Sequence, residues 1–183
     1  MKTNESIEKR RSIRKFKETN FKLEDINEML KAGLYAPSSC GRRPWEFIVI
    51  DDKILLNQIA LGVKNDDYNP QLGIAICTNT KKYVCRKCEN MNCDDGWIQD
   101  CAAAMQNILL QATELGFGSV WIGILDVEER ENVVNELLNL PEDVSTLGIA
   151  YIGEADEIPE PRTFDFENIH WNKFGVKSSE LEI

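Results

Sequence analysis

The longest regular pattern in this chain is an apolar helix that ends at a glycine and passes directly into a strand. From Ile98 to Leu115, apolar side chains recur at spacings of three and four, and three consecutive alanines begin at Ala102. Gly116 stands where a left-handed C-cap is expected, and the apolar run Ser119–Ile122 predicts a strand after it. Because alanine permits close backbone approach, we expect this helix to lie at the centre of the fold or at an interface.

The remaining regular segments alternate between helical and strand patterns. Apolar spacings of three and four, with acidic residues in the first turn, are typical of helices, whereas short apolar runs are typical of buried strands. The order is not a clean βαβ repeat, so residues 1–183 are predicted to form one α+β domain. Helices are expected at 23–36, 54–61 and 127–138, and strands at 46–51, 73–77 and 146–152.

Charge and composition exclude several classes of protein. The formal net charge of -10 argues against general affinity for nucleic acid or anionic membranes. No run approaches the roughly 18 consecutive apolar residues of a membrane span, and no secretory signal is visible at the N-terminus. Six cysteines without an export signal indicate reduced thiols. These features predict a cytoplasmic protein that binds neither nucleic acid nor membranes.

A basic segment at residues 10–16 stands apart from the acidic average. Three arginines and a serine within five residues supply donors suited to phosphate oxygens. The alternatives are a basic, solvated helix end and a nucleic-acid patch, and the second is weak without wider basicity. The candidate anion ligands are Arg10, Arg11, Ser12 and Arg14.

The segment 36–47 predicts a loop with exposed backbone groups. Pro37 ends the preceding helix, and small hydroxyl residues and Gly41 follow it. Such a loop can meet the polar edge of a flat ligand. A plain helix-to-strand connection with Trp45 in the core is the alternative interpretation.

The glycines of segment 115–123 resemble a dinucleotide-binding fingerprint, but the order of elements is wrong for it. That fingerprint follows a strand and opens a helix, whereas here a helix precedes a strand. Gly116 and Gly118 instead fit a helix C-cap and a tight turn. Gly123, at the end of the strand, can let a planar ring approach the backbone.

Taken together and in this order, the three segments resemble the nitroreductase family. The match continues with Leu147–Gly153 and with Arg162 in a proline-rich tail, so it runs across nearly the whole chain. The resemblance implies a nitroreductase-like fold, with a central, mostly antiparallel sheet flanked by helices. It also implies an intertwined homodimer with flavins in the dimer interface, and a tail at 159–183 that reaches the partner subunit.

The resemblance also implies FMN as the cofactor and assigns its phosphate ligands. The phosphate and ribityl region would be held by Arg10, Arg11, Ser12 and Arg14. Arg162 would return from the tail to the same phosphate. The basic segment and the tail are therefore expected to meet.

The flavin ring is expected, on the same resemblance, to lie between two segments. Pro37, Ser38 and Ser39 would approach it from the partner subunit, and Ile122 and Gly123 would line its other side.

Two positions in the loop depart from the family pattern. The family usually has Asn where this chain has Gly41, and Gln where it has Arg43. Gly41 removes a side-chain partner for the flavin. Arg43 either favours the anionic reduced flavin electrostatically or faces solvent.

The activity that the resemblance implies is an FMN-dependent oxidoreductase. It would pass hydride equivalents from NAD(P)H to nitroaromatic, quinone or similar small acceptors by a ping-pong mechanism, and the flavin rather than a side chain would carry the chemistry. One alternative is a specialised flavin dehydrogenase or dehalogenase with a fixed small substrate. The other is a non-catalytic thiolate metal-binding or redox-sensing protein on the same scaffold.

A cysteine-rich segment at 83–96 supports that last alternative. Cys85 and Cys88 form a CxxC, and Cys93 follows five residues later. Thiolates at such spacings can bind zinc or an iron–sulfur cluster, but no second CxxC follows and the single histidine, His170, is far away in the sequence. The resemblance implies a variable insertion here, so inert thiols are expected, with a metal site or a redox pair as the alternatives.

Overall fold

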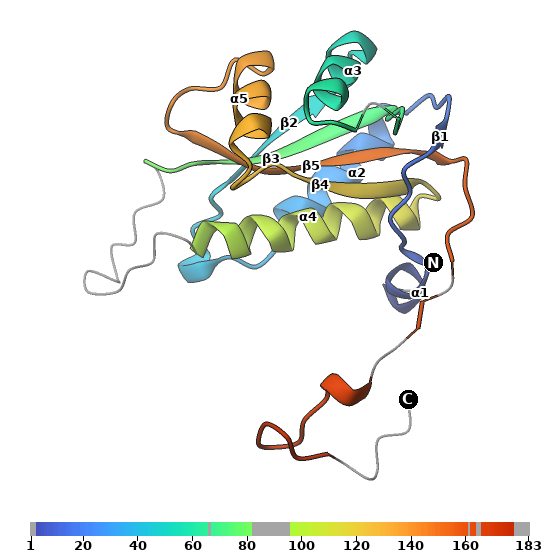
Figure 1. Ribbon diagram of the computed structural model, residues 1–183, viewed down its shortest axis with the longest axis vertical. Coiled ribbons are helices and arrows are strands. Elements are labelled where there is room, and N and C mark those ends of the chain that lie inside the picture. Colours follow the sequence, from blue (N-terminus) through green and yellow to red (C-terminus); the bar gives the residue numbers. More distant parts are fainter. Residues whose placement is uncertain (1–2, 66, 82–95, 161, 164–165, 178–183) are drawn as a thin grey trace.

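The computed structural model describes residues 3–65, 67–81, 96–160, 162–163 and 166–177. Figure 1 shows one sheet with a helical layer on each face and a C-terminal tail that leaves the body. No helix in these ranges is both long enough and apolar enough to cross a membrane. Cys85, Cys88 and Cys93 lie outside the described residues.

The sheet has five antiparallel strands, which confirms the predicted α+β class. β2 (Trp45–Ile50), β3 (Leu72–Asn79) and β5 (Val144–Ala155) form its middle, in the order β2-β3-β5. β4 (Gly118–Gly123) and the short β1 (Phe16–Lys17) pair with successive parts of β5 on its other side. Two segments distant in sequence therefore meet along one edge of β5.

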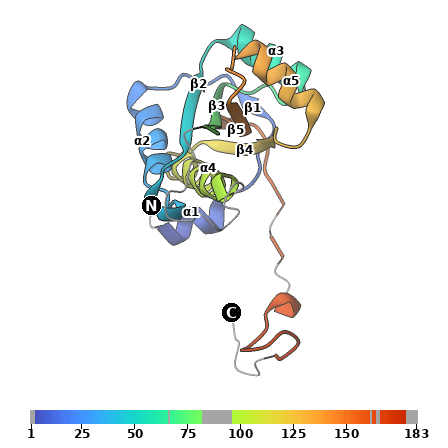
Figure 2. The ribbon, with the colours of Figure 1, turned by 90° about the vertical axis from the view of Figure 1, so that its left-hand side faces the viewer.

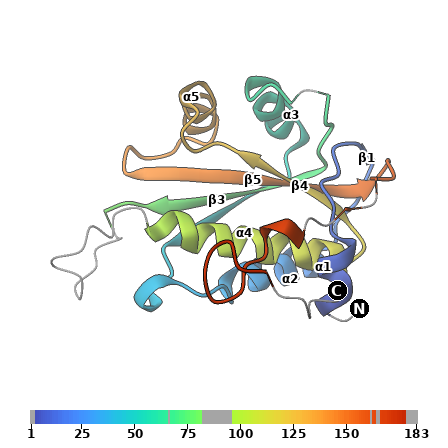
Figure 3. The ribbon, with the colours of Figure 1, turned by 60° about the horizontal axis from the view of Figure 1, so that its bottom comes forward.

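The helices form two layers. Figures 1 and 3 show α4 and α2 on one face of the sheet and α3 and α5 on the other. α1 packs near the C-terminal end of α4, where Ser6 Oγ donates to Glu114 Oε2 at 2.8 Å. The bounds are α1 (Thr3–Lys9), α2 (Leu23–Leu34), α3 (Lys53–Gly62), α4 (Gly96–Glu114) and α5 (Glu128–Leu137).

Alternation along the strands divides the core between the two faces. In β3, Leu72, Ile74 and Ile76 belong to the cluster beneath α2 and α4. Ala75 and Cys77 point the other way, into the cluster beneath α3 and α5. A continuous apolar run thus fits a central strand that is buried on both faces.

α4 occupies the central position that its alanines predict. Met105 and Ile108 are fully buried, and each contributes about 1.5–3 kcal/mol by removal from water. Gly116 has a φ of +89°, and Phe117 N donates to Ala112 O at 2.8 Å, which confirms the left-handed C-cap. The C-cap at Gly116 therefore fixes the point at which the chain leaves α4 and enters β4.

The sequence missed or misplaced a few boundaries. α1, β1 and the short 3-10 turn η1 (Ser39–Gly41) were not expected, and the helix predicted to reach residue 36 ends at Leu34. β5 extends to Ala155 because β1 pairs with its last residues. These elements depend on contacts with distant segments, which a local periodicity does not encode.

The described part of the tail lies apart from the body. Figure 2 shows the segment that contains η2 (Phe166–Asn168) well separated from the helices and the sheet. Ile158 is 97% exposed and Phe174 is 92% exposed. An apolar tail with so little cover in one chain is a candidate for contact with another chain.

Candidate functional site

The basic segment lies directly against the start of β4. Ser12 forms an isolated parallel bridge with Ser119, and Ile13 N donates to Ser119 O at 3.0 Å. A Cβ on Gly118 would lie only 2.9 Å from Ile13 side-chain atoms, so glycine is needed for this close approach. Ile13 is buried, which anchors the segment and leaves Arg14 exposed beside it.

Three of the predicted arginines share one corner of the molecule. Burial lowers the pKa of Arg10 from its ordinary value, and the positive charges of Arg162 and Arg11 lower it further. Arg162 from the tail is thus within electrostatic reach of Arg10, as the predicted clamp requires. Crowded cations in a chain of net charge -10 favour an anion at this point, which would relieve their mutual repulsion. We call Arg10, Arg11, Ser12 and Arg162 the arginine corner.

Arg14 takes a different direction from these arginines. Its guanidinium carbon lies 6.0 Å from the centre of the Tyr68 ring, a distance typical of a weak cation–π contact. Its backbone N–H donates to Glu157 Oε1. Its predicted contact with a phosphate remains a prediction.

The predicted loop has an unusual backbone. Cys40, Gly41 and Arg43 have φ values of 54°, 66° and 50°, so three of four consecutive residues are left-handed. Each non-glycine residue in this region carries a strain on the order of 1 kcal/mol or more, which the surroundings must hold. No atom lies within 4 Å of the Cβ position of Gly41, so the loop is open there.

Two hydrogen bonds to side chains help to hold this loop in place. Ser39 N donates to Asp100 Oδ1 at 2.9 Å, and Arg43 N donates to Ser38 Oγ at 3.0 Å. Asp100 is buried near the start of α4, whereas Ser39 itself is exposed. The hydroxyl of Ser39 is therefore presented outward from a fixed backbone. We call residues 37–43 the flavin loop, after its predicted role.

The end of β4 offers a flat and open edge. Gly123 is exposed, and no atom lies within 4 Å of its Cβ position. Its carbonyl accepts from Arg130 Nη1 at 2.8 Å. Ile122, in contrast, is 4% exposed and points into the core beneath α3 and α5, so only its backbone can line a ring. Trp121, which the sequence analysis did not select, is 37% exposed on the opposite side of the strand.

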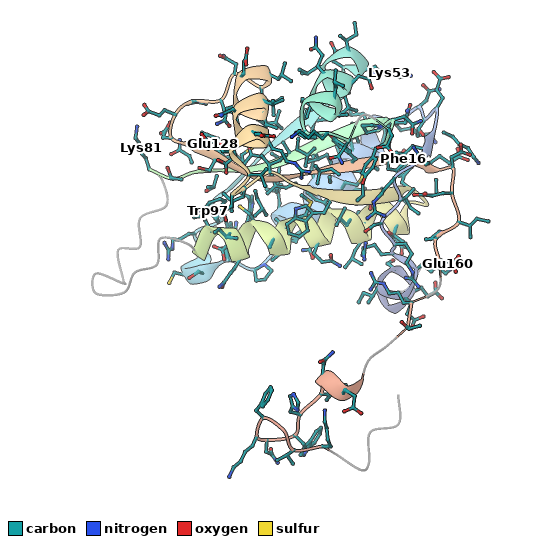
Figure 4. All side chains as sticks on the ribbon, in the orientation of Figure 1. Phe16, Lys53, Lys81, Trp97, Glu128 and Glu160 are labelled. Carbon is teal, nitrogen blue, oxygen red and sulfur yellow. The ribbon has the colours of Figure 1, made fainter. Side chains whose placement is uncertain are left out.

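The arginine corner and the flavin loop lie at opposite ends of α4. In Figure 4, Trp97 marks the loop end of this helix, whereas Phe16 and Glu160 mark the corner end. The helical rise puts roughly 20 Å between Asp100 and Glu114 along the axis. Within one chain, the flavin loop and the arginine corner are therefore not brought together.

Two carboxylates that shape these regions were missed from the sequence. Asp100 lies on the same helical stripe as the buried Ala104 and Ile108, and a carboxylate on a core stripe signals a fixed partner. Glu157 accepts hydrogen bonds from Arg14 N and Lys15 N, which lie 143 and 142 residues away in the sequence. No local sequence pattern predicts that contact.

The two buried cysteines, Cys77 and Cys101, are unsuited to thiolate chemistry. Burial raises the pKa of Cys77 to about 11 and that of Cys101 to about 12. Cys40, in the flavin loop, is exposed. Within the described ranges, no group of three or more potential metal ligands is found. The candidate ligands of segment 83–96 lie outside those ranges.

Comparisons with known proteins agree with this architecture. Residues 7–78 and 94–154 match the nitroreductase family. The chain is 35% identical over 173 residues to a proposed NADH dehydrogenase/NAD(P)H nitroreductase from Archaeoglobus fulgidus, covering 90% of this chain and 94% of the relative.

Comparison with solved structures also identifies nitroreductases as similar proteins. A proposed NADH dehydrogenase/NAD(P)H nitroreductase from Parabacteroides distasonis has a TM-score of 0.82 at 32% identity, covering 94% of this chain and 98% of its own. An FMN-dependent nitroreductase from Clostridium difficile has a TM-score of 0.81 at 35% identity, covering 92% and 98%.

Proposed function

Because this chain belongs to the nitroreductase family, we propose that it is an FMN-dependent oxidoreductase that passes hydride equivalents from NAD(P)H to a small acceptor. The observation that carries the proposal is the arginine corner at the start of β4, with the open Gly123 at the end of the same strand. An FMN-dependent nitroreductase of the same fold, 35% identical to this chain, supports the choice of cofactor.

The residues present fit the phosphate of FMN. Arg10 and Arg162 repel each other, since the charge of Arg162 lowers the pKa of Arg10. A phosphate would replace that repulsion with charge-assisted hydrogen bonds, which are stronger than neutral ones. Arg11 and Ser12, which adjoin Arg10 in the same segment, can add further donors. Arg14 would contribute from the exposed side of that segment.

The residues near β4 fit a flat ring. Gly123 leaves space where a side chain would stand, so the ring can approach the backbone. The backbone of Ile122 adjoins it. The ring would supply the two-electron chemistry when bound, while the protein positions it and excludes competing reactions.

We infer that the other side of the ring is covered by the flavin loop of a second copy. In one chain the flavin loop lies at the N-terminal end of α4 and the arginine corner at its C-terminal end, which supports taking Pro37, Ser38 and Ser39 from a partner. Exposed apolar side chains support a homodimer: Tyr35 is 84% exposed at the end of α2, and Trp171 is 53% exposed in the tail. The tail from residue 159 onward would contact that partner.

The proposed acceptors are nitroaromatics, quinones or similar small molecules. NAD(P)H and the acceptor would occupy the same cavity in turn, so we expect ping-pong kinetics. Arg43, exposed in the flavin loop, would add positive charge near the ring in place of a neutral amide. That charge would favour an anionic reduced form.

The test is a visible absorption spectrum, followed by addition of a nicotinamide and then of a quinone. The purified dimer should show flavin absorption and release FMN on denaturation, at about one per chain. Anaerobic NADH or NADPH should bleach it, and a quinone should restore the colour. A colourless protein that carries stoichiometric zinc would reject the proposal and favour a thiolate metal-binding protein. A coloured protein that neither nicotinamide bleaches would leave the cofactor in place and reject the donor.

A further inference from the structure

The start of the C-terminal tail is joined to the basic segment by a short ladder. Phe16 pairs with Ala155 and Lys17 with Glu154, and Asp156 N donates to Lys15 O at 2.9 Å. Figure 1 shows the tail leaving β5 beside β1 and passing α1. Backbone pairing therefore guides the tail as far as residue 156, six residues before Arg162.

Glu157 continues this attachment with its side chain. Its Oε1 accepts from Arg14 N and, at 3.3 Å, from Lys15 N. Two successive backbone amides thus converge on one carboxylate oxygen. Glu157 is half-buried, and it lines a cavity of about 290 Å³ together with Arg11, Ile13 and Gly118. The residue after it, Ile158, is 97% exposed, so it gives the tail no comparable hold.

We propose that Glu157 is a positioning residue that braces the tail against the basic segment and so delivers Arg162 to the anion-binding corner. The inference rests on the proposed function, because the anion is taken to be the phosphate of FMN. Glu157 does not touch the phosphate in this account. It fixes the last point from which the chain runs to Arg162.

The negative charge and the acceptor oxygen of Glu157 act in opposite directions. The charge opposes a phosphate in the same corner, although solvent and salt weaken this effect at a half-exposed site. The acceptor oxygen orders the tail and so favours phosphate binding. Glu157→Gln removes the charge and keeps an acceptor, whereas Glu157→Ala removes both.

The experiment compares FMN with riboflavin, which lacks the phosphate. The dimer is stripped of FMN by dialysis, and each flavin is titrated back by fluorescence. Glu157→Ala should weaken FMN binding about tenfold, the scale of one hydrogen bond to a charged group, and leave riboflavin within about twofold. Glu157→Gln should keep FMN affinity within about threefold of the parent protein. Glu154→Ala, a matched carboxylate that accepts from Lys17 Nζ at 2.9 Å, should change neither affinity.

A double-substitution cycle tests whether Glu157 acts through Arg162. In an Arg162→Ala background, Glu157→Ala should cause no further loss of FMN affinity. An unchanged FMN affinity in Glu157→Ala, an equal loss for both flavins, or full additivity with Arg162→Ala would each overturn the inference while leaving the proposed function intact. A parent protein that binds neither flavin would instead reject the proposed function.

Discussion

The arginine corner and the flavin loop are held by different kinds of interaction. In the corner, backbone pairing joins three segments far apart in sequence, since Ser12 bridges to Ser119 and Phe16 pairs with Ala155. In the loop, a strained backbone is held by short-range turn hydrogen bonds and by two hydrogen bonds to side chains, from Ser39 N to Asp100 and from Arg43 N to Ser38. The segment that carries Arg10 and Arg11 is therefore tied to the sheet, whereas the loop is held mainly by local contacts and by Asp100. We expect the corner to remain formed in one chain and the loop to be the more easily opened of the two.

The largest expected difference between the loop and the core is in the rate of thiol labelling. Cys40 is exposed in the loop, whereas burial raises the pKa of Cys101 to about 12. Since the thiolate is the reactive form, a maleimide should modify Cys40 about a hundredfold faster than Cys101 near pH 8. Peptide mass mapping over time measures both rates. Bound FMN should slow the reaction of Cys40, and equal rates at the two cysteines would show that the comparison is wrong.

Substitutions in the corner should act on binding rather than on folding. Arg10→Ala should weaken FMN binding by about 1.5–3 kcal/mol, the scale of a hydrogen bond to a charged group. Arg14→Ala should lose less, because its guanidinium lies 6.0 Å from the Tyr68 ring centre. Titration of the flavin-free protein with FMN gives both values. An Arg14 loss larger than the Arg10 loss would place the phosphate on the other side of the segment.

Substitutions beneath the loop should act on stability first. Asp100→Ala removes the acceptor of Ser39 N and should lower the free energy of unfolding by about 1–2 kcal/mol. Cys40 labelling should then become faster, because the loop opens more often. Urea unfolding and labelling of the same variant check both outcomes. A loss of stability without faster labelling would mean that Asp100 does not hold the loop.

The smallest effect is expected at Arg43. Its backbone N–H makes the contact to Ser38, and its side chain is exposed, so Arg43→Gln should change the free energy of unfolding by less than about 0.5 kcal/mol. The same substitution should make reduction of the flavin less favourable, because a positive charge near the ring is lost. A spectroelectrochemical titration measures that shift. An unchanged potential would indicate that Arg43 faces solvent.

The elements that the sequence predicts well are those whose pattern is local. The stripe of α4 and the apolar run of β3 follow from burial on known periods, and their positions are confirmed within a few residues. β1 could not be predicted, because two residues become a strand only by pairing with the end of β5. Ile122 shows the same limit at the site: its place in the sequence was suggestive, but the alternation of β4 turns its side chain into the core.

The most direct test of the account asks whether one site takes its corner from one chain and its loop from another. A heterodimer with two affinity tags would carry Arg10→Ala and Arg162→Ala in one chain and Ser39→Glu in the other. If corner and loop come from different chains, one site holds all the substitutions and the other is intact, so the heterodimer should bind one FMN with the parent affinity and retain turnover there. Two weakened FMN sites, with no parent-like binding at either, would contradict the account and place corner and loop in the same chain.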